Sequence, residues 1–217
     1  MASTITLAPV QTIAATPNAA PARPSSPAQF ASQAADKTLG ATTTAAPVST
    51  SGDADAARSA AVLKYAQNKV GQQDGNGECY TLADNALRAA GAKSAPDYGK
   101  ITSTADYKWG KSVPLDGSKP GDVLQFKDYK NTTKTTQEDG GYQTETQTRP
   151  HHTAVVVDND GKGNITVLEQ NVPHGGETKT TVLHFGNGTT KGEDGSTTTS
   201  KTTGTVKAYH PEPQETK

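Results

Sequence analysis

The apolar residues of segment 79–90 recur at intervals of three and four, which is the clearest periodicity in the chain. They are Cys79, Leu82, Ala83, Ala86, Leu87 and Ala90. A stripe of this kind must be buried against another element, so it commits the chain to a helix packed on a core. Gly91 follows and is a typical C-terminal stop. The segment therefore predicts an amphipathic helix that carries the single cysteine in its first turn, at the edge of the core.

A further helix is predicted upstream, from about residue 51 to residue 70. Ser51 can cap its first turn, and Asp53 and Asp55 place negative charge near its amino end. The apolar positions at helical spacing are Leu63, Ala66 and Val70. Gly71 then ends the helix, and a polar, glycine-rich loop leads to the second helix.

Downstream of the helices, short apolar segments alternate with polar turns. The predicted strands cover residues 123–126, 152–157, 165–170, 180–185 and 205–210. Residues 130–150 are rich in Thr, Gln and Glu without a core pattern, so they form either a long loop or an extended hairpin. Residues 186–204 are a second polar segment between predicted strands. Two helices followed by four or five meandering strands predict an α+β fold, with an antiparallel sheet or partial barrel against the helices.

The amino-terminal part differs in composition from the rest. Residues 1–52 are rich in Ala, Thr, Ser and Pro and cannot bury enough apolar surface to offset chain entropy. We expect them to be a disordered leader. Residues 53–212 then form one domain, and residues 213–217 a short tail.

The leader does not have the pattern of a secretory signal peptide. Its first basic residue is Arg23, and Pro9 interrupts the only apolar stretch near the start. A low-charge leader of this composition resembles the export signals of proteins injected by bacterial contact-dependent secretion systems. The protein is therefore expected either to be exported by such a route or to be cytoplasmic. In the second case the leader would be a plain flexible tail.

Composition and charge argue against several classes of protein. The net charge of −1 gives no electrostatic reason to bind nucleic acid. No apolar run is long enough for a transmembrane helix. One cysteine excludes an intramolecular disulfide, and no Cys/His cluster has the spacing of a zinc site. His151 and His152 are adjacent on a predicted strand and point to opposite faces, so no metal and no cofactor is expected.

Three segments far apart in the sequence carry residues suited to acyl-transfer chemistry. Cys79 begins a helix, where the amino end of the helix and a nearby imidazolium would favour its thiolate. His152 heads an apolar strand and would be the general base. Glu169 or Asn171 would orient the imidazole, since residues two apart share one side of a strand. The sequence predicts a Cys-His-Glu/Asn site and leaves the third member open.

Each of these residues also has a structural interpretation. Free cysteine is among the most buried residue types, so Cys79 alone would be read as a core residue. His152 would then be an ordinary strand histidine. Tyr80 and Trp109 either line a groove or pack in the core. The catalytic interpretation rests on the combination.

The chain resembles the CHAP family of cysteine amidohydrolases and peptidases, which is related to NlpC-type and papain-like enzymes. The matching motifs are residues 77–79, 120–126, 152–156 and 165–171, within a stretch from residue 62 to residue 171. Two positions depart from the family pattern: His151 stands where the family usually has Gly, and Leu82 where it usually has an aromatic residue. In papain-like enzymes an oxyanion-hole glutamine lies six residues before the cysteine, which here is Gln73.

This resemblance implies a papain-like fold and a cysteine hydrolase that cuts amide bonds in peptidoglycan, as an amidase or endopeptidase. A second hypothesis is an effector or toxin that uses the same site as a protease or deamidase on a protein. A third is a non-catalytic binding module. The implied partners are a peptidoglycan stem peptide or a protein substrate, with an inhibitor or immunity protein as a further class, and the chain is expected to be a monomer.

Overall fold

The computed structural model describes residues 51–102 and 105–215. The predicted leader lies outside this part except for its last two residues. The described helices are α1 (Ser51–Gln67) and α2 (Cys79–Ala89), with single 3-10 turns at Ala95–Asp97 and Leu115–Gly117. The strands are β1 (Lys111–Val113), β2 (Val123–Thr136), β3 (Tyr142–Asn159), β4 (Asn164–Glu169), β5 (Lys179–His184), β6 (Gly188–Lys191) and β7 (Thr197–His210).

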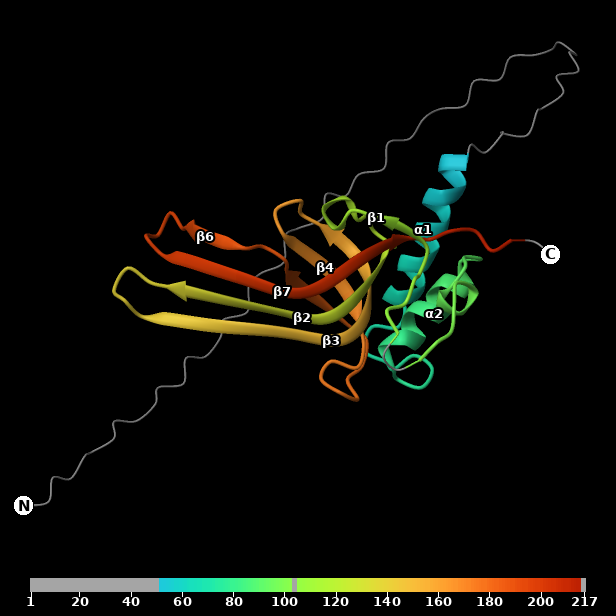
Figure 1. Ribbon diagram of the computed structural model, residues 1–217, viewed down its shortest axis with the longest axis horizontal. Helices are drawn as coiled ribbons and strands as arrows, with labels where there is room; N and C mark the ends of the chain where they lie inside the picture. The colour runs from blue at the N-terminus through green and yellow to red at the C-terminus, as the bar shows by residue number, and fades with distance from the viewer. Residues whose placement is uncertain (1–50, 103–104, 216–217) are drawn as a thin grey trace, which may run out of the picture. The chain divides into compact units, whose positions relative to one another are not determined.

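The strands of the described part form one seven-stranded antiparallel sheet in the order β1-β7-β2-β3-β4-β5, with β6 paired to β7. The two helices gather at one end of the sheet, and β2, β3 and β7 continue away from them (Figure 1). The predicted α+β class, with helices packed on an antiparallel sheet, is confirmed. None of the helices in the described part has the length and apolar character needed to cross a membrane.

The inner ends of β2 and β3 are buried on both faces. Val123 and Val155 face the helices and join a core around Trp109 and the apolar stripe of α2. Leu124 and Ala154 face the opposite way and join a second core inside the curled sheet. This double burial explains why both segments read as continuous apolar runs instead of alternating ones.

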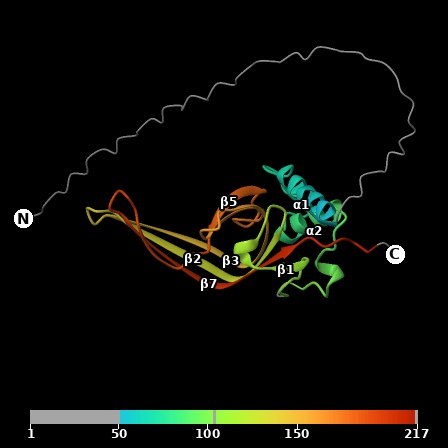
Figure 2. The ribbon, with the colours of Figure 1, turned by 90° about the horizontal axis from the view of Figure 1, so that it is seen from above.

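The outer ends of the same strands form a long polar hairpin, seen at the left of Figure 1 and again in Figure 2. Its register continues from Lys130↔Thr148 to Thr136↔Tyr142. Of the two alternatives for residues 130–150, the extended hairpin is therefore right. Residues 186–204 are also largely strand, whereas the sequence predicted only a second polar segment there. Threonine is β-branched and suits a pleated surface even where no apolar pattern marks it.

A bulge separates the inner and outer parts of β2. Its register with β7 shifts between Lys127 and Lys130, and Asp128 has a φ of 55°. Gly204 of β7 lies against this bulge with a φ of 84°, and a Cβ there would come within 2.2 Å of the Asp128 carbonyl oxygen. Only glycine fits this contact. The bulge bends the strand at this point.

Candidate active site

Cys79 is the first residue of α2 and is half-buried, as the periodicity of the helix predicts. The preceding Glu78 has an extended backbone with a φ of −79° and a ψ of 144°. The loop before it turns sharply at Gly75, which has a φ of 57° and whose added Cβ would overlap the Thr81 side chain at 2.2 Å. Cys79 therefore lies at the amino end of α2, which is the positive end of the helix dipole.

The loop before Cys79 is anchored by Gln170, which the sequence analysis did not single out. The side chain of Gln170 is fully buried. Its Oε1 accepts from the backbone N–H of Asp74 at 2.9 Å, and its Nε2 donates to the carbonyl oxygens of Asp74 at 3.1 Å and Glu78 at 2.6 Å. Because Glu78 precedes the cysteine, Gln170 ties the end of β4 directly to the backbone that holds Cys79.

Asp74 connects the same loop to both helices. Its carboxylate accepts from Asn85 Nδ2 of α2 at 2.9 Å and from the Tyr65 hydroxyl of α1 at 3.2 Å. Lys69 Nζ lies 2.8 Å away and supplies a positive charge. A buried carboxylate is costly unless it is paired and hydrogen-bonded, and Asp74 is both. These contacts fix the position of the loop before Cys79 relative to the core.

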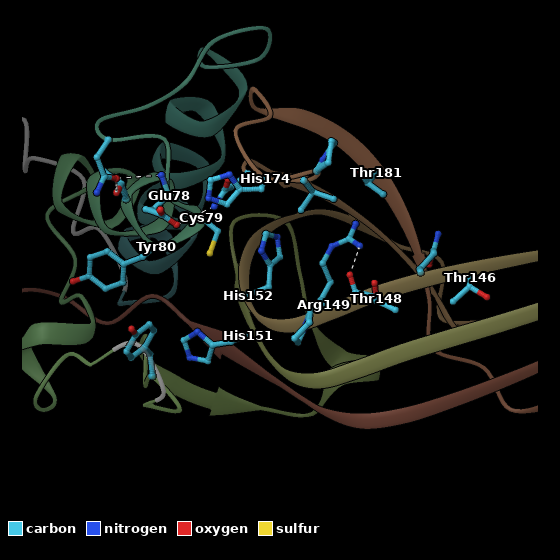
Figure 3. A pocket seen from close by; sticks show the side chains of 18 of the residues that line it. Glu78, Cys79, Tyr80, Thr146, Thr148, Arg149, His151, His152, His174 and Thr181 are labelled. Carbon is cyan, nitrogen blue, oxygen red and sulfur yellow. Dashed lines mark hydrogen bonds between the residues drawn. The ribbon is translucent and has the colours of Figure 1, made fainter.

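His152 lies on β3, is buried, and connects Cys79 to Glu169. Its Nε2 is 3.0 Å from Glu169 Oε2, and interaction with the Cys79 side chain acts to raise its pKa. Because Glu169 occupies Nε2, the nitrogen that serves Cys79 is Nδ1. The close view shows the sulfur of Cys79 beside the ring of His152 (Figure 3). The structure therefore brings three of the residues singled out from the sequence into one chain of contacts.

Glu169 is held on its other side by Arg149. Arg149 Nε donates to Oε2 at 2.7 Å and Nη2 to Oε1 at 2.5 Å, which is a bidentate pair between buried side chains. Burial acts to raise the pKa of Glu169, but the hydrogen bonds and charges of His152 and Arg149 outweigh it and lower this pKa to about 2. Glu169 therefore stays ionised opposite the imidazole.

The same contacts favour the imidazolium. Burial of His152 acts to lower its pKa, but the hydrogen bonds to Cys79 and Glu169 outweigh this effect and raise the pKa above its ordinary value of 6.5. A histidine that takes a proton from a thiol must be stabilised in its charged form. The arrangement of Cys79, His152 and Glu169 has this property.

Asn171 does not reach the histidine. Strand β4 ends at Glu169, and Asn171 has a φ of 67°, so the two residues do not share one side of a strand. Its Nδ2 donates to Glu78 Oε2 at 2.9 Å, and its Oδ1 accepts from the Gly175 N–H at 2.6 Å. The structure thus places Glu169 on the imidazole and Asn171 on the residue before the nucleophile.

Gln73 also lies apart from the histidine. Its Nε2 donates to the carbonyl oxygen of Gly175 at 2.6 Å, and it does not line the cavity at Cys79. The expectation that Gln73 holds an oxyanion stays a prediction. Asn76 is a side-chain amide that does line the cavity next to Cys79.

His151 faces away from His152, as adjacent strand residues should. Its Nε2 is 2.6 Å from the Ala105 carbonyl oxygen, and its ring meets that of Tyr107 edge-on at 5.1 Å. Trp109 is fully buried and donates from Nε1 to Gln125 Oε1 at 2.9 Å, so it packs in the core. Among residues 51–102 and 105–215, no group of three or more His, Cys, Asp or Glu side chains is arranged to hold a metal ion.

A cavity of about 940 Å³ opens at Cys79 and His152. One wall is formed by residues 145–152 of β3, and the other by residues 171–174 and Thr181 of β5. Tyr80 and Tyr107 border the cavity at the cysteine end. The site thus brings together a cysteine, a histidine and a carboxylate beside a cavity that is larger than a single side chain.

Comparison with known proteins gives one family and one curated relative. The model of the AIM3/BBC1 cysteine proteinase-fold domain matches residues 52–194, which is more than half of the chain. The chain is also similar to Altered inheritance of mitochondria protein 3 of Debaryomyces hansenii, with 32% identity over 125 residues. The match covers 51% of this chain and 12% of that relative. No solved structure gave a significant match.

Proposed function

The chain belongs to the family of AIM3/BBC1 cysteine proteinase-fold domains, and we propose on this premise that it hydrolyses amide bonds through Cys79. The observation that carries the proposal is the placement of His152 between the sulfur of Cys79 (Figure 3) and the carboxylate of Glu169. A structural cysteine needs neither a histidine beside its sulfur nor a buried carboxylate behind that histidine.

The proposed reaction has two steps. The Cys79 thiolate attacks the amide carbon while His152 holds the proton that it took from the thiol. The C–N bond breaks, the amine leaves with the proton from His152, and a thioester remains on Cys79. Water then attacks the thioester as His152 takes its proton, and the acid and the free thiol are released. The backbone N–H of Cys79, at the start of α2, would donate to the oxyanion.

Glu169 and Arg149 act through His152 in this mechanism. Glu169 accepts a hydrogen bond from Nε2 and so selects the ring orientation in which Nδ1 faces the sulfur. Arg149 keeps the carboxylate ionised and fixes its plane by a bidentate contact. Both are therefore positioning residues.

Two substrate classes follow from the sequence. The resemblance to CHAP enzymes favours the stem peptide of peptidoglycan, and the same site on a protein would be a protease or deamidase. The name of the fungal relative speaks of mitochondrial inheritance and does not name a substrate. We therefore propose amide hydrolysis as the reaction. The class of substrate is inferred from the shape of the cavity.

The test is cleavage of a proteome-derived peptide library and of purified peptidoglycan by the full chain, with new amino groups and fragment masses read by mass spectrometry. The wild-type chain should produce fragments, and Cys79→Ala should produce none while keeping the same melting temperature. A fully active Cys79→Ala chain would refute the proposal. Inactivity of both, with Cys79 alkylated no faster than a free thiol, would indicate a binding module on this fold.

A further inference from the structure

Strand β3 has a free edge beside the cavity. β2 pairs with one side of β3 from Tyr142 to Val155. On the other side, the pairing with β4 covers only residues 155–159. Within the described part of the chain, no strand pairs with that side of residues 142–154. An unpaired edge presents backbone N–H and C=O groups that can accept another strand.

This edge forms one wall of the cavity. Every residue from 145 to 152 borders it. Side chains alternate between the two faces of a strand, so a cavity over one face would meet every second residue only. A cavity bordered by consecutive residues therefore runs along the edge of the strand. The close view shows Arg149, Thr148 and Thr146 following His152 along this line (Figure 3).

The backbone groups of Thr148 are directed towards this edge. Its carbonyl oxygen accepts from Arg149 Nη1 at 2.8 Å. The residue paired with it on β2 is Lys130, whose carbonyl oxygen accepts from the Thr203 hydroxyl of β7 at 3.4 Å. Alternate residues of an antiparallel strand direct both backbone groups to the same edge. The N–H groups of Thr148 and Thr146 therefore belong to the cavity wall.

The side chains that accompany these groups suit recognition of a main chain. Thr146 and Thr148 are exposed and small, while Gln147 between them turns inward and donates to the Val182 carbonyl oxygen of β5 at 2.9 Å. Neither threonine supplies an apolar pocket for one anchoring group. The wall offers the N–H groups of Thr146 and Thr148 and the Thr146 carbonyl oxygen, whereas the Thr148 carbonyl oxygen is bonded to Arg149 and Pro150 has no N–H.

We propose that the β3 edge binds an extended polypeptide as an added strand, which delivers one of its peptide bonds to Cys79. The inference deepens the proposed function, because it names an unfolded segment of a protein as the substrate class. Strand addition obtains affinity from main-chain hydrogen bonds, so the binding tolerates many side-chain sequences. A folded protein whose strands are already paired does not present such a strand.

The experiment uses the full chain with reduced, carboxymethylated ribonuclease A as the extended polypeptide and native ribonuclease A as the folded control. Thr148→Pro removes the N–H at the edge, and proline is tolerated where that N–H faces away from a partner strand. Thr148→Ala removes the side chain and keeps the N–H. Thr144→Pro is the matched control, because it lies on the same edge beyond the cavity.

Wild type should cleave the unfolded ribonuclease and leave the native form intact. Thr148→Pro should lower kcat/KM at least about tenfold, since it loses a hydrogen bond and crowds the edge. Thr148→Ala should lose less than Thr148→Pro, and Thr144→Pro should match wild type. Equal losses for Thr148→Ala and Thr148→Pro would overturn the proposal, as would cleavage of purified peptidoglycan without cleavage of the polypeptide.

A binding measurement separates this proposal from the proposed reaction. Cys79→Ala has no nucleophile but keeps the β3 edge, so it should still bind the unfolded ribonuclease. Hydrogen exchange should then show added protection of residues 145–149, with no change in β6. Binding without cleavage by wild type would refute the reaction and keep the edge proposal. Absence of protection at residues 145–149 would refute the edge proposal alone.

Discussion

The inner and outer parts of the β2–β3 hairpin share one register but lie in opposite environments. In the inner part, Phe126 and Val156 are fully buried. In the outer part, Tyr142 is 70% exposed, the threonines of β3 are exposed and those of β2 are half-buried. Cross-strand contacts there join pairs such as Thr135 and Thr198, with hydroxyl oxygens 3.1 Å apart. Apolar burial holds the first part together, whereas backbone pairing and β-propensity hold the second.

The candidate site lies at the boundary between these parts. His152 and Arg149 are buried, while Thr148 next to them is exposed. Charged groups are strongest as catalysts where water is excluded, yet a substrate must still reach them. The junction of a closed core with an open edge meets both requirements. Stability should therefore depend on the closed core, and reactivity on the groups at its open edge.

The largest effect is expected for His152→Ala on amide hydrolysis. Loss of the base should lower kcat/KM by about 10³- to 10⁴-fold. His151→Ala should lose far less, because its ring contacts the Ala105 carbonyl oxygen and Tyr107 instead of Cys79. The measurement is a progress curve with the unfolded polypeptide. Equal losses for the two histidines would contradict the assignment of roles.

Stability should follow the inner part of the hairpin. Phe126→Ala removes a ring packed against Tyr129 and Phe185 and should lower the free energy of unfolding by about 3–5 kcal/mol. Thr132→Ala in the outer part should change it by less than about 0.5 kcal/mol. Urea unfolding followed by circular dichroism checks both values. A large loss in Thr132→Ala would mean that the outer part carries stability too.

The buried ion pair at the boundary should behave differently from an exposed one. Arg149→Met leaves the carboxylate of Glu169 buried without its bidentate partner and should cost about 3–5 kcal/mol of unfolding free energy. Arg88→Met, which breaks the more exposed pair with Asp84, should cost less than about 1 kcal/mol. Chemical denaturation of both variants gives the comparison. Similar costs would show that burial of the first pair is not decisive.

The smallest effect concerns pH. The pKa of Glu169 falls from 4.5 to about 2 on folding, so its contribution to stability is present above pH 4.5 and lost as pH falls towards 2. The pKa of His152 is raised above 6.5, so its contribution is present below pH 6.5 and lost as pH rises through the raised value. Unfolding free energies should therefore be greatest between about pH 4.5 and 6.5. A Glu169→Gln chain that keeps the same profile would contradict this.

Much of the fold and the position of Cys79 could be predicted from local patterns. The stripe of α2 placed Cys79 at a helix start on the edge of the core, and continuous apolar runs marked the inner strands. The sequence could not distinguish a hairpin from a loop in the outer part. Strands with solvent on both faces do not show the alternation of apolar and polar residues that marks a half-buried strand. β6 was missed for the same reason.

The third member of the site could not be fixed from sequence. The rule that residues two apart share a face holds only within a strand, and β4 ends at Glu169, before Asn171. Arg149 gave no signal, since one arginine in a polar segment usually marks solvent exposure. Gln170 stands between Glu169 and Asn171, and its anchoring of the Cys79 loop depends on contacts 92 and 96 residues apart.

The most direct test of the central claim is the rate at which iodoacetamide alkylates Cys79 at pH 6, measured by intact mass in wild type and in His152→Ala. The sulfur is the only cysteine sulfur in the chain, so the label is unambiguous. If His152 holds the thiol proton, wild type should react at least about tenfold faster, because the thiolate is the nucleophile. Equal rates in two folded proteins would show that Cys79 is not activated and would refute the catalytic site.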